Sequence, residues 1–215
     1  MIFTSFTFII FFSILISCLL ISKNTSFRIN ILLIASYIFY GWWNINYLIL
    51  IFIVSFTGWG FGYLIAIEKN ESKRKLFLYC NLLICLGMLG YFKYANFFLD
   101  TIDTAFDFNA EPLDILLPVG ISFFTFQTLS YTLDIYRNKI PVCKNFLKFA
   151  LFVSFFPQLV AGPIVRASEF LPQLEKKIIL TKDNLVIGSQ IFLGGALQKV
   201  LIADNLSQYV DIIYK

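Results

Sequence analysis

The fold is decided by residues 29–67, INILLIASYIFYGWWNINYLILIFIVSFTGWGFGYLIAI, which hold no charged side chain over 39 consecutive positions. A helix needs about 20 apolar residues to cross a hydrocarbon core about 30 Å thick, so this stretch is long enough for two crossings. Gly41, Trp42, Trp43 and Asn44, near its middle, supply turn formers and interfacial aromatic side chains. The stretch therefore predicts a hairpin of two membrane-spanning helices.

The composition of the whole chain agrees with a lipid environment. Of its 215 residues 59% are hydrophobic and 14% are charged, against the roughly 25% charged that is usual in soluble domains. The net charge of +4 is too small for a nucleic-acid-binding protein. The chain has no His and its four Cys lack metal-site spacing, so we expect no metal site and no disulfide.

Other charge-poor runs extend the prediction along the chain. We expect an all-α integral membrane protein, a multi-span helical bundle, in which residues 1–215 belong to a single polytopic domain. The predicted spans are residues 1–22, 29–45, 46–67, 76–98, 115–136 and 185–206, with a re-entrant or broken helix at residues 149–165.

Loop charges predict the orientation. Basic residues follow the first, third and fifth spans, whereas the loop at residues 99–114 carries five acidic residues and no basic one. Because cytoplasmic loops are enriched in Lys and Arg, we expect a multi-pass protein of the inner (plasma) membrane with its N-terminus outside. Asp107 should then face outward, and these residues should face the cytoplasm: Lys23, Arg28, Lys69, Lys73, Arg74, Lys75, Arg137, Lys139, Lys144 and Lys148.

A polar stripe interrupts the span at residues 115–136. Its members recur at intervals of three and four residues, which places them on one face of a helix. Uncompensated polar groups in hydrocarbon cost several kcal/mol, so this face should not meet lipid. It either forms hydrogen bonds between helices or lines a substrate path. The stripe consists of Gln127, Ser130, Tyr131 and Asp134.

The segment at residues 149–165 is unsuited to a straight crossing. Pro157 and Pro163 remove backbone donors, and basic residues follow from Arg166 onward. A broken or re-entrant helix keeps those charges in the cytoplasm. A full crossing that leaves them outside is the alternative.

Three ordered strings carry a family resemblance that covers nearly the whole chain. Residues 117–127 read LPVGISFFTFQ, residues 155–166 read FFPQLVAGPIVR, and residues 195–206 read GALQKVLIADNL. Together they resemble the membrane-bound O-acyltransferase family, and within it the branch of alginate O-acetyltransferases.

The resemblance implies an enzyme that passes an acyl group, acetyl in this branch, from a cytoplasmic thioester donor to a polysaccharide hydroxyl. The donor would be acetyl-CoA or an acyl carrier, used as co-substrate, with no bound cofactor. The acceptor would be an exported or cell-surface polysaccharide such as alginate, or a periplasmic transfer partner.

The family assigns the general base to a membrane-embedded His, for which this chain has no counterpart. The resemblance therefore implies an N-terminal portion that is inactive alone, and it gives no catalytic residue here. Whether the chain is a fragment, a truncation or a split half stays open.

We expect the substrate path to run beside the polar stripe and the broken helix. The alternative functions are a transporter or flippase module and a non-catalytic membrane subunit. The candidate path residues are Gln127, Ser130, Tyr131, Asp134, Gln158 and Arg166.

Overall fold

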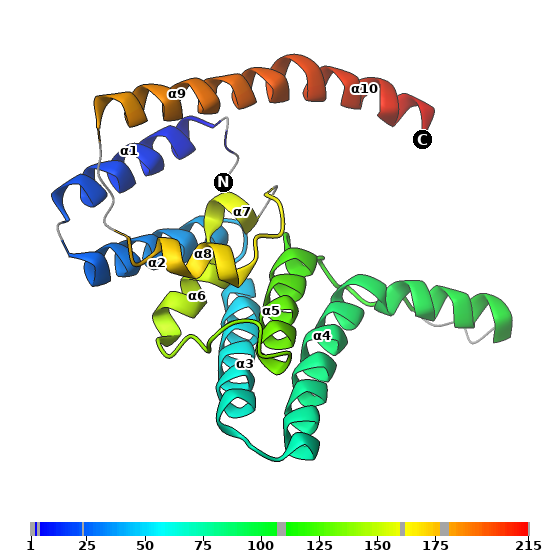
Figure 1. The fold of residues 1–215 in the computed structure, drawn as a ribbon. Helices are drawn as coiled ribbons and strands as arrows, with labels where there is room; N and C mark the ends of the chain where they lie inside the picture. Colours follow the sequence, from blue (N-terminus) through cyan, green and yellow to red (C-terminus); the bar gives the residue numbers. More distant parts are fainter. Residues whose placement is uncertain are drawn as a thin grey trace. The chain divides into compact units, whose positions relative to one another are not determined.

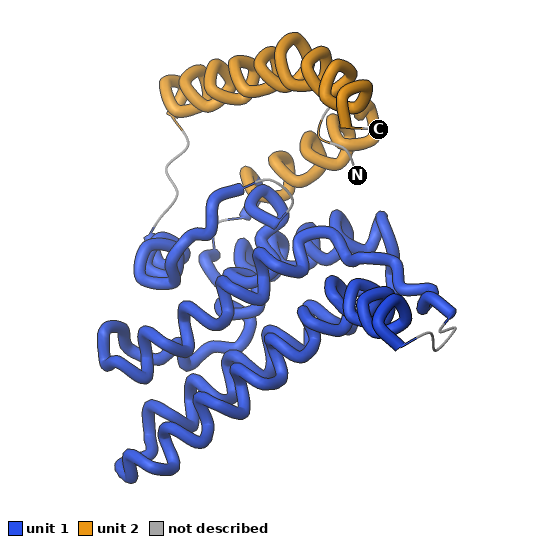
Figure 2. The backbone as a smooth tube through the Cα atoms, turned by 90° about the vertical axis from the view of Figure 1, so that its right-hand side faces the viewer, with its two compact units in different colours: residues 1, 21–176 blue, residues 2–20, 177–215 orange. Residues whose placement is uncertain are grey.

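The computed structural model describes residues 3, 5–22, 24–106, 111–159, 162–176 and 181–214. All regular elements in these ranges are helices, which confirms the all-α prediction. The orientation markers Lys23 and Asp107 lie outside the described residues. The chain forms two compact units, one of residue 1 with residues 21–176 and one of residues 2–20 with 177–215 (Figure 2).

The first unit is built around three helices that pack against one another, α3 (Tyr47–Ile67), α4 (Glu71–Phe106) and α5 (Ile121–Tyr136) (Figure 1). Two glycines on α3 allow α5 to approach closely. A Cβ atom at Gly58 would lie 2.2 Å from Thr128 Cγ2, and one at Gly62 would lie 2.8 Å from Tyr131 Cε1. This small-xxx-small spacing is typical of close helix pairs in membranes.

Four further helices complete this unit: α2 (Thr25–Gly41), α6 (Phe146–Ser154), α7 (Phe156–Leu159) and α8 (Ala167–Gln173). Helix α6 packs against α2, α3, α5 and α8, and its residues 149–154 are all buried. It begins where the Asn145 side chain accepts the backbone N–H groups of Leu147 and Lys148. The predicted broken helix is therefore an interior element of the unit.

Helix α4 is longer than one crossing requires. Its 36 residues would measure about 54 Å if straight, and Figure 1 shows its C-terminal part turning away from α3 and α5. The chain then returns alongside it, because the Asn96 side chain exchanges two hydrogen bonds of 3.0 Å with the Leu113 backbone.

Helix α5 begins at Ile121, later than the predicted span at residues 115–136. Pro118 disfavours helical geometry at the residue before it. Gly120 then adopts a left-handed conformation (φ 75°) at the N-cap, and a Cβ atom there would lie 2.3 Å from Leu159 O. The start of α5 is thus fixed by its fit against the end of α7.

The second unit contains α1 (Phe6–Ile21), α9 (Lys182–Leu197), the π-helix η1 (Gln198–Ala203) and α10 (Asp204–Ile213). The last three form one continuous helix whose residues are all solvent-accessible in the structure, and the Phe12 and Phe192 rings stack at 6.3 Å. By length and composition, α3, α4 and residues 182–213 could each cross a membrane. The protein is membrane-embedded.

Candidate functional site

Two members of the polar stripe, Gln127 and Tyr131, are buried against neighbouring elements. Gln127 is 4% exposed, and its Nε2 donates to Phe152 O of α6 at 2.8 Å. Tyr131 is fully buried, and its hydroxyl accepts the Cys143 N–H at 3.0 Å. Its ring lies 4.4 Å from that of Phe149. Both side chains hold α6 and the loop at residues 137–145 against α5.

The other two members lie at the margin of the stripe. Ser130 is half-buried and donates to Gln127 O, one turn earlier in the same helix, at 2.9 Å. Asp134 is half-buried, and no side-chain hydrogen bond or ion pair of its carboxylate occurs among the described residues. The polar face of α5 thus combines interhelical hydrogen bonds with one carboxylate at its edge, Asp134, that could bind a further group.

A hydrogen bond to α2 holds the break between α6 and α7. Phe155 has ψ of 108° and interrupts the helix, and the N–H of Phe156 donates to Ser36 Oγ at 3.3 Å. Ser36 in turn donates to Leu32 O at 2.8 Å. A single buried hydroxyl therefore satisfies the backbone donor at the break.

Gln158 follows the break and is only partly satisfied. Its backbone carbonyl accepts the Gly162 N–H at 3.0 Å, but its buried Oε1 has no hydrogen-bond partner among the described residues. Buried polar atoms are almost always hydrogen-bonded, so this oxygen could accept a hydrogen bond from a water or a ligand. Of the six candidates, it is the one with an unused buried polar atom.

Arg166 lies at the exposed N-cap position of α8, where its side chain makes no capping hydrogen bond. Within the described part of the chain, no hydrogen bond joins it to Gln127, Tyr131 or Gln158. The structure brings together Gln127 and Tyr131 around α6, and leaves Arg166 at a separate, solvent-facing position.

Residues outside the predicted set fix the loop at residues 137–145. Trp59 Nε1 donates to Cys143 O at 2.9 Å, while the Cys143 N–H is taken by Tyr131. Burial raises the pKa of the Cys143 thiol, so this side chain is not an activated nucleophile. The sequence signal for this contact was a lone Trp among the glycines of α3, which is too general to identify a partner.

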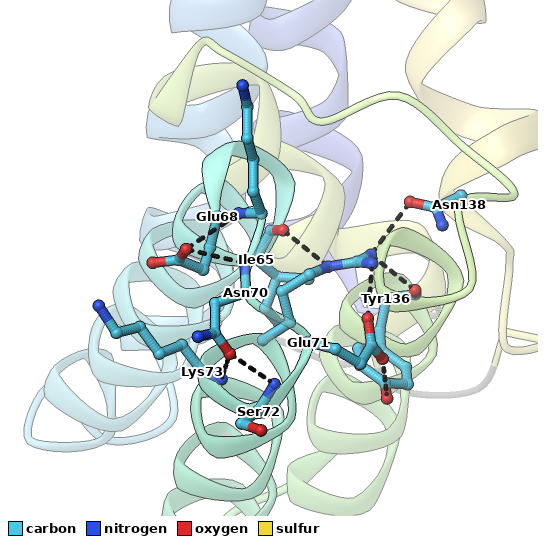
Figure 3. A network of polar contacts seen from close by, with 10 residues as sticks. Ile65, Glu68, Asn70, Glu71, Ser72, Lys73, Tyr136 and Asn138 are labelled. Atoms are coloured by element: carbon cyan, nitrogen blue, oxygen red, sulfur yellow. Dashed lines mark hydrogen bonds and ion pairs between the residues drawn. The ribbon is translucent and has the colours of Figure 1, made fainter.

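A second unpredicted feature is a polar network where α3 and α5 end and α4 begins (Figure 3). The Arg74 guanidinium donates to Ile65 O at 3.2 Å, Tyr136 O at 2.9 Å and Asn138 Oδ1 at 3.0 Å, and its side chain is 14% exposed. Glu71 pairs with Arg74 at 3.2 Å and accepts the Tyr136 hydroxyl at 2.7 Å. Arg74 was predicted only as an orientation marker, yet it joins the ends of three helices.

The described residues contain no cluster of three or more His, Cys, Asp or Glu side chains able to hold a metal ion. The packing of the helices defines the class of protein: a helical membrane bundle with an interior broken helix beside a buried polar face. Comparison with known proteins identifies the family.

The sequence profile of the membrane-bound O-acyltransferase family matches residues 138–215. A protein of Azotobacter vinelandii named "Probable alginate O-acetylase" is 37% identical over 98% of this chain and 43% of its own length. Its namesake in Pseudomonas aeruginosa is 36% identical over 98% of this chain and 41% of its own length. A peptidoglycan O-acetyltransferase of Helicobacter pylori is 36% identical over 88% of this chain and 41% of its own length.

The chain therefore belongs to the membrane-bound O-acyltransferase family, as the resemblance predicted. It spans about two fifths of the length of the curated relatives that it matches. No solved structure shows a significant match to it.

Proposed function

We propose that this chain forms part of a membrane O-acyltransferase that transfers an acetyl group to a hydroxyl of an exported polysaccharide. The observation that carries the proposal is the similarity to acetylases of alginate and of peptidoglycan over most of the chain. The donor is a thioester on the cytoplasmic side, acetyl-CoA or an acyl carrier, and it acts as a co-substrate. The acceptor is the polysaccharide itself or a transfer partner outside.

In this proposal the chain positions substrates and does not supply the general base. The acceptor hydroxyl must lose a proton as it attacks the thioester carbonyl, and the chain has no His to accept it. The buried Oε1 of Gln158 is available to accept a hydrogen bond from a substrate donor group. Gln127 and Tyr131 act as positioning residues, since they hold α6, and with it the break before Gln158.

A chimera tests the proposal. The portion of the Azotobacter vinelandii acetylase that matches this chain is replaced by residues 1–215, and acetyl ester on the exported alginate is measured in cells lacking the native enzyme. We expect acetylation above that of the deletion strain. A chimera present at normal abundance in the membrane that adds no acetyl ester contradicts the proposal.

The 215 residues expressed alone provide the complementary measurement. We expect no transfer of acetyl from acetyl-CoA to polysaccharide above background, because the proton acceptor is missing. Transfer by this chain alone would overturn the assignment of the base to a residue outside it.

The proposed orientation places the N-terminus outside the inner membrane. Single cysteines at positions 73 and 107, introduced after the four native Cys are replaced, are treated with an impermeant thiol reagent on whole cells. We expect labelling at position 107 and protection at position 73. The reverse pattern would put the donor on the wrong side of the membrane.

A further inference from the structure

A cavity of about 500 Å³ lies in the first unit between the loop at residues 137–145, the first turn of α6 and helix α8. Its lining combines apolar and charged side chains. Among the residues around it are Pro141, Lys144, Lys148, Ser168, Leu171 and Glu175.

The charges of this cavity are only partly compensated. Lys148 Nζ donates to Glu175 Oε1 at 2.8 Å, and this ammonium holds the pKa of the Glu175 carboxyl below its usual range. Lys144 is exposed and forms no ion pair with any described residue. The lining of the cavity thus includes one lysine that is free to bind an anion and a second whose partner is an exposed carboxylate.

The cavity sits at the boundary between charged and apolar parts of the chain. The loop beside it carries Arg137, Lys139 and Lys144, whereas α6 becomes fully buried from Phe149 onward. A ligand that fits both parts has an anionic head and an apolar stem. Basic pockets on the cytoplasmic side of membrane helices commonly bind lipid headgroups with this chemistry.

We propose that this cavity binds the phosphate headgroup of an anionic phospholipid from the cytoplasmic leaflet. Lys144 and Lys148 contact the phosphate, the Ser168 hydroxyl is available to donate to it, and the side chains of Pro141 and Leu171 pack against the glycerol and the first methylenes. The site is separate from the proposed acyl transfer, but it relies on the same orientation of the chain. Coenzyme A carries phosphates of similar chemistry, so the experiment distinguishes the two sources.

The full chain, purified in a neutral detergent, is titrated with phosphatidylglycerol, with zwitterionic phosphatidylcholine and with coenzyme A. Bound lipid is counted by native mass spectrometry, and the apparent dissociation constant is taken from the titration. We expect saturable binding of phosphatidylglycerol that exceeds that of phosphatidylcholine. Equal binding of the two lipids, or binding of coenzyme A in place of phosphatidylglycerol, overturns the proposal.

Two substitutions and a matched control locate the site. Each lysine contributes about fivefold to the affinity for an anionic lipid. Replacing both Lys144 and Lys148 by Gln should therefore weaken phosphatidylglycerol binding about 25-fold. Lys139→Gln removes the same charge from the same loop but not from this cavity, and its affinity should stay within about twofold of wild type. Equal losses in the double variant and the control would mean that loop charge, and not this cavity, attracts the lipid.

Glu175→Gln should change the lipid affinity in the opposite direction. It therefore tests the site even if the double variant fails to fold. Loss of the carboxylate frees the Lys148 ammonium and removes a repulsive charge, so phosphatidylglycerol should bind several-fold more tightly. A Lys148–Glu175 pair that only fastens the residues after α8 to α6 predicts unchanged or weaker lipid binding. Either of those results contradicts the proposal.

Discussion

Replacing Gly58 by Ala tests whether the close approach of α3 and α5 sets the stability of the first unit. The added Cβ would lie 2.2 Å from Thr128 Cγ2, whereas carbon atoms at van der Waals contact are about 3.5–4.0 Å apart. Thr128 is fully buried, so its side chain has little room to move away. To restore ordinary van der Waals contact, either α5 shifts by about 1.5 Å or the Thr128 side chain leaves its rotamer.

The expected loss follows from two opposing effects. Overpacking costs about 1–3 kcal/mol, and Ala recovers up to about 1 kcal/mol over Gly in a helix. The net loss of up to about 2 kcal/mol lowers the melting temperature by up to about 8 °C for a chain of this size. Gly60→Ala is the matched control, since a Cβ there meets nothing within 4 Å, and it should melt at or slightly above the wild-type temperature.

Cys85 provides the assay, because it is fully buried on α4. With Cys18, Cys80 and Cys143 replaced by Ser, a thiol-reactive fluorophore reports unfolding as the detergent-solubilised protein is heated. If the Gly58 and Gly60 variants melt at the same temperature, the close α3–α5 contact is not a determinant of stability, and the packing argument is wrong.

Three further substitutions examine the ends of the bundle and the candidate site. Arg74→Gln should cost about 2 kcal/mol in the same melting assay, since two backbone carbonyls lose a charged donor, whereas exposed Lys73→Gln should stay within about 0.5 kcal/mol. Tyr131→Phe should cost about 1–2 kcal/mol and accelerate hydrogen exchange of the Cys143 amide, which loses its acceptor. Arg166→Gln in the acetylating chimera should leave abundance unchanged and raise the KM for the donor, if the guanidinium contacts the donor. Loss of protein with unchanged KM would indicate a packing role, and wild-type values for both would exclude both roles.

Much of the fold follows from the sequence because lipid imposes a simple requirement. Backbone polar groups in the hydrocarbon must be hydrogen-bonded within the protein, and a long charge-free run satisfies nearly all of its own groups when it forms a helix. The run at residues 29–67 contains most of α2 and all of α3, of which only α3 is long and apolar enough to cross a membrane. Pro157 predicts an interruption in the segment at residues 149–165, and the structure has one between α6 and α7. The family could also be predicted, because three ordered strings carry it.

Only the tertiary structure decides which polar groups are used in packing. The spacing of the stripe puts Gln127 and Tyr131 on one face of a helix, but their partners, Phe152 O and the Cys143 N–H, come from elements 25 and 12 residues away. The same holds for Gly58 and Gly62, whose role depends on α5 lying against them, and for Arg74, whose backbone acceptors belong to α3 and α5. Hydropathy is a property of each segment and can be read along the chain, whereas a hydrogen bond or a close contact depends on how separate segments meet in space.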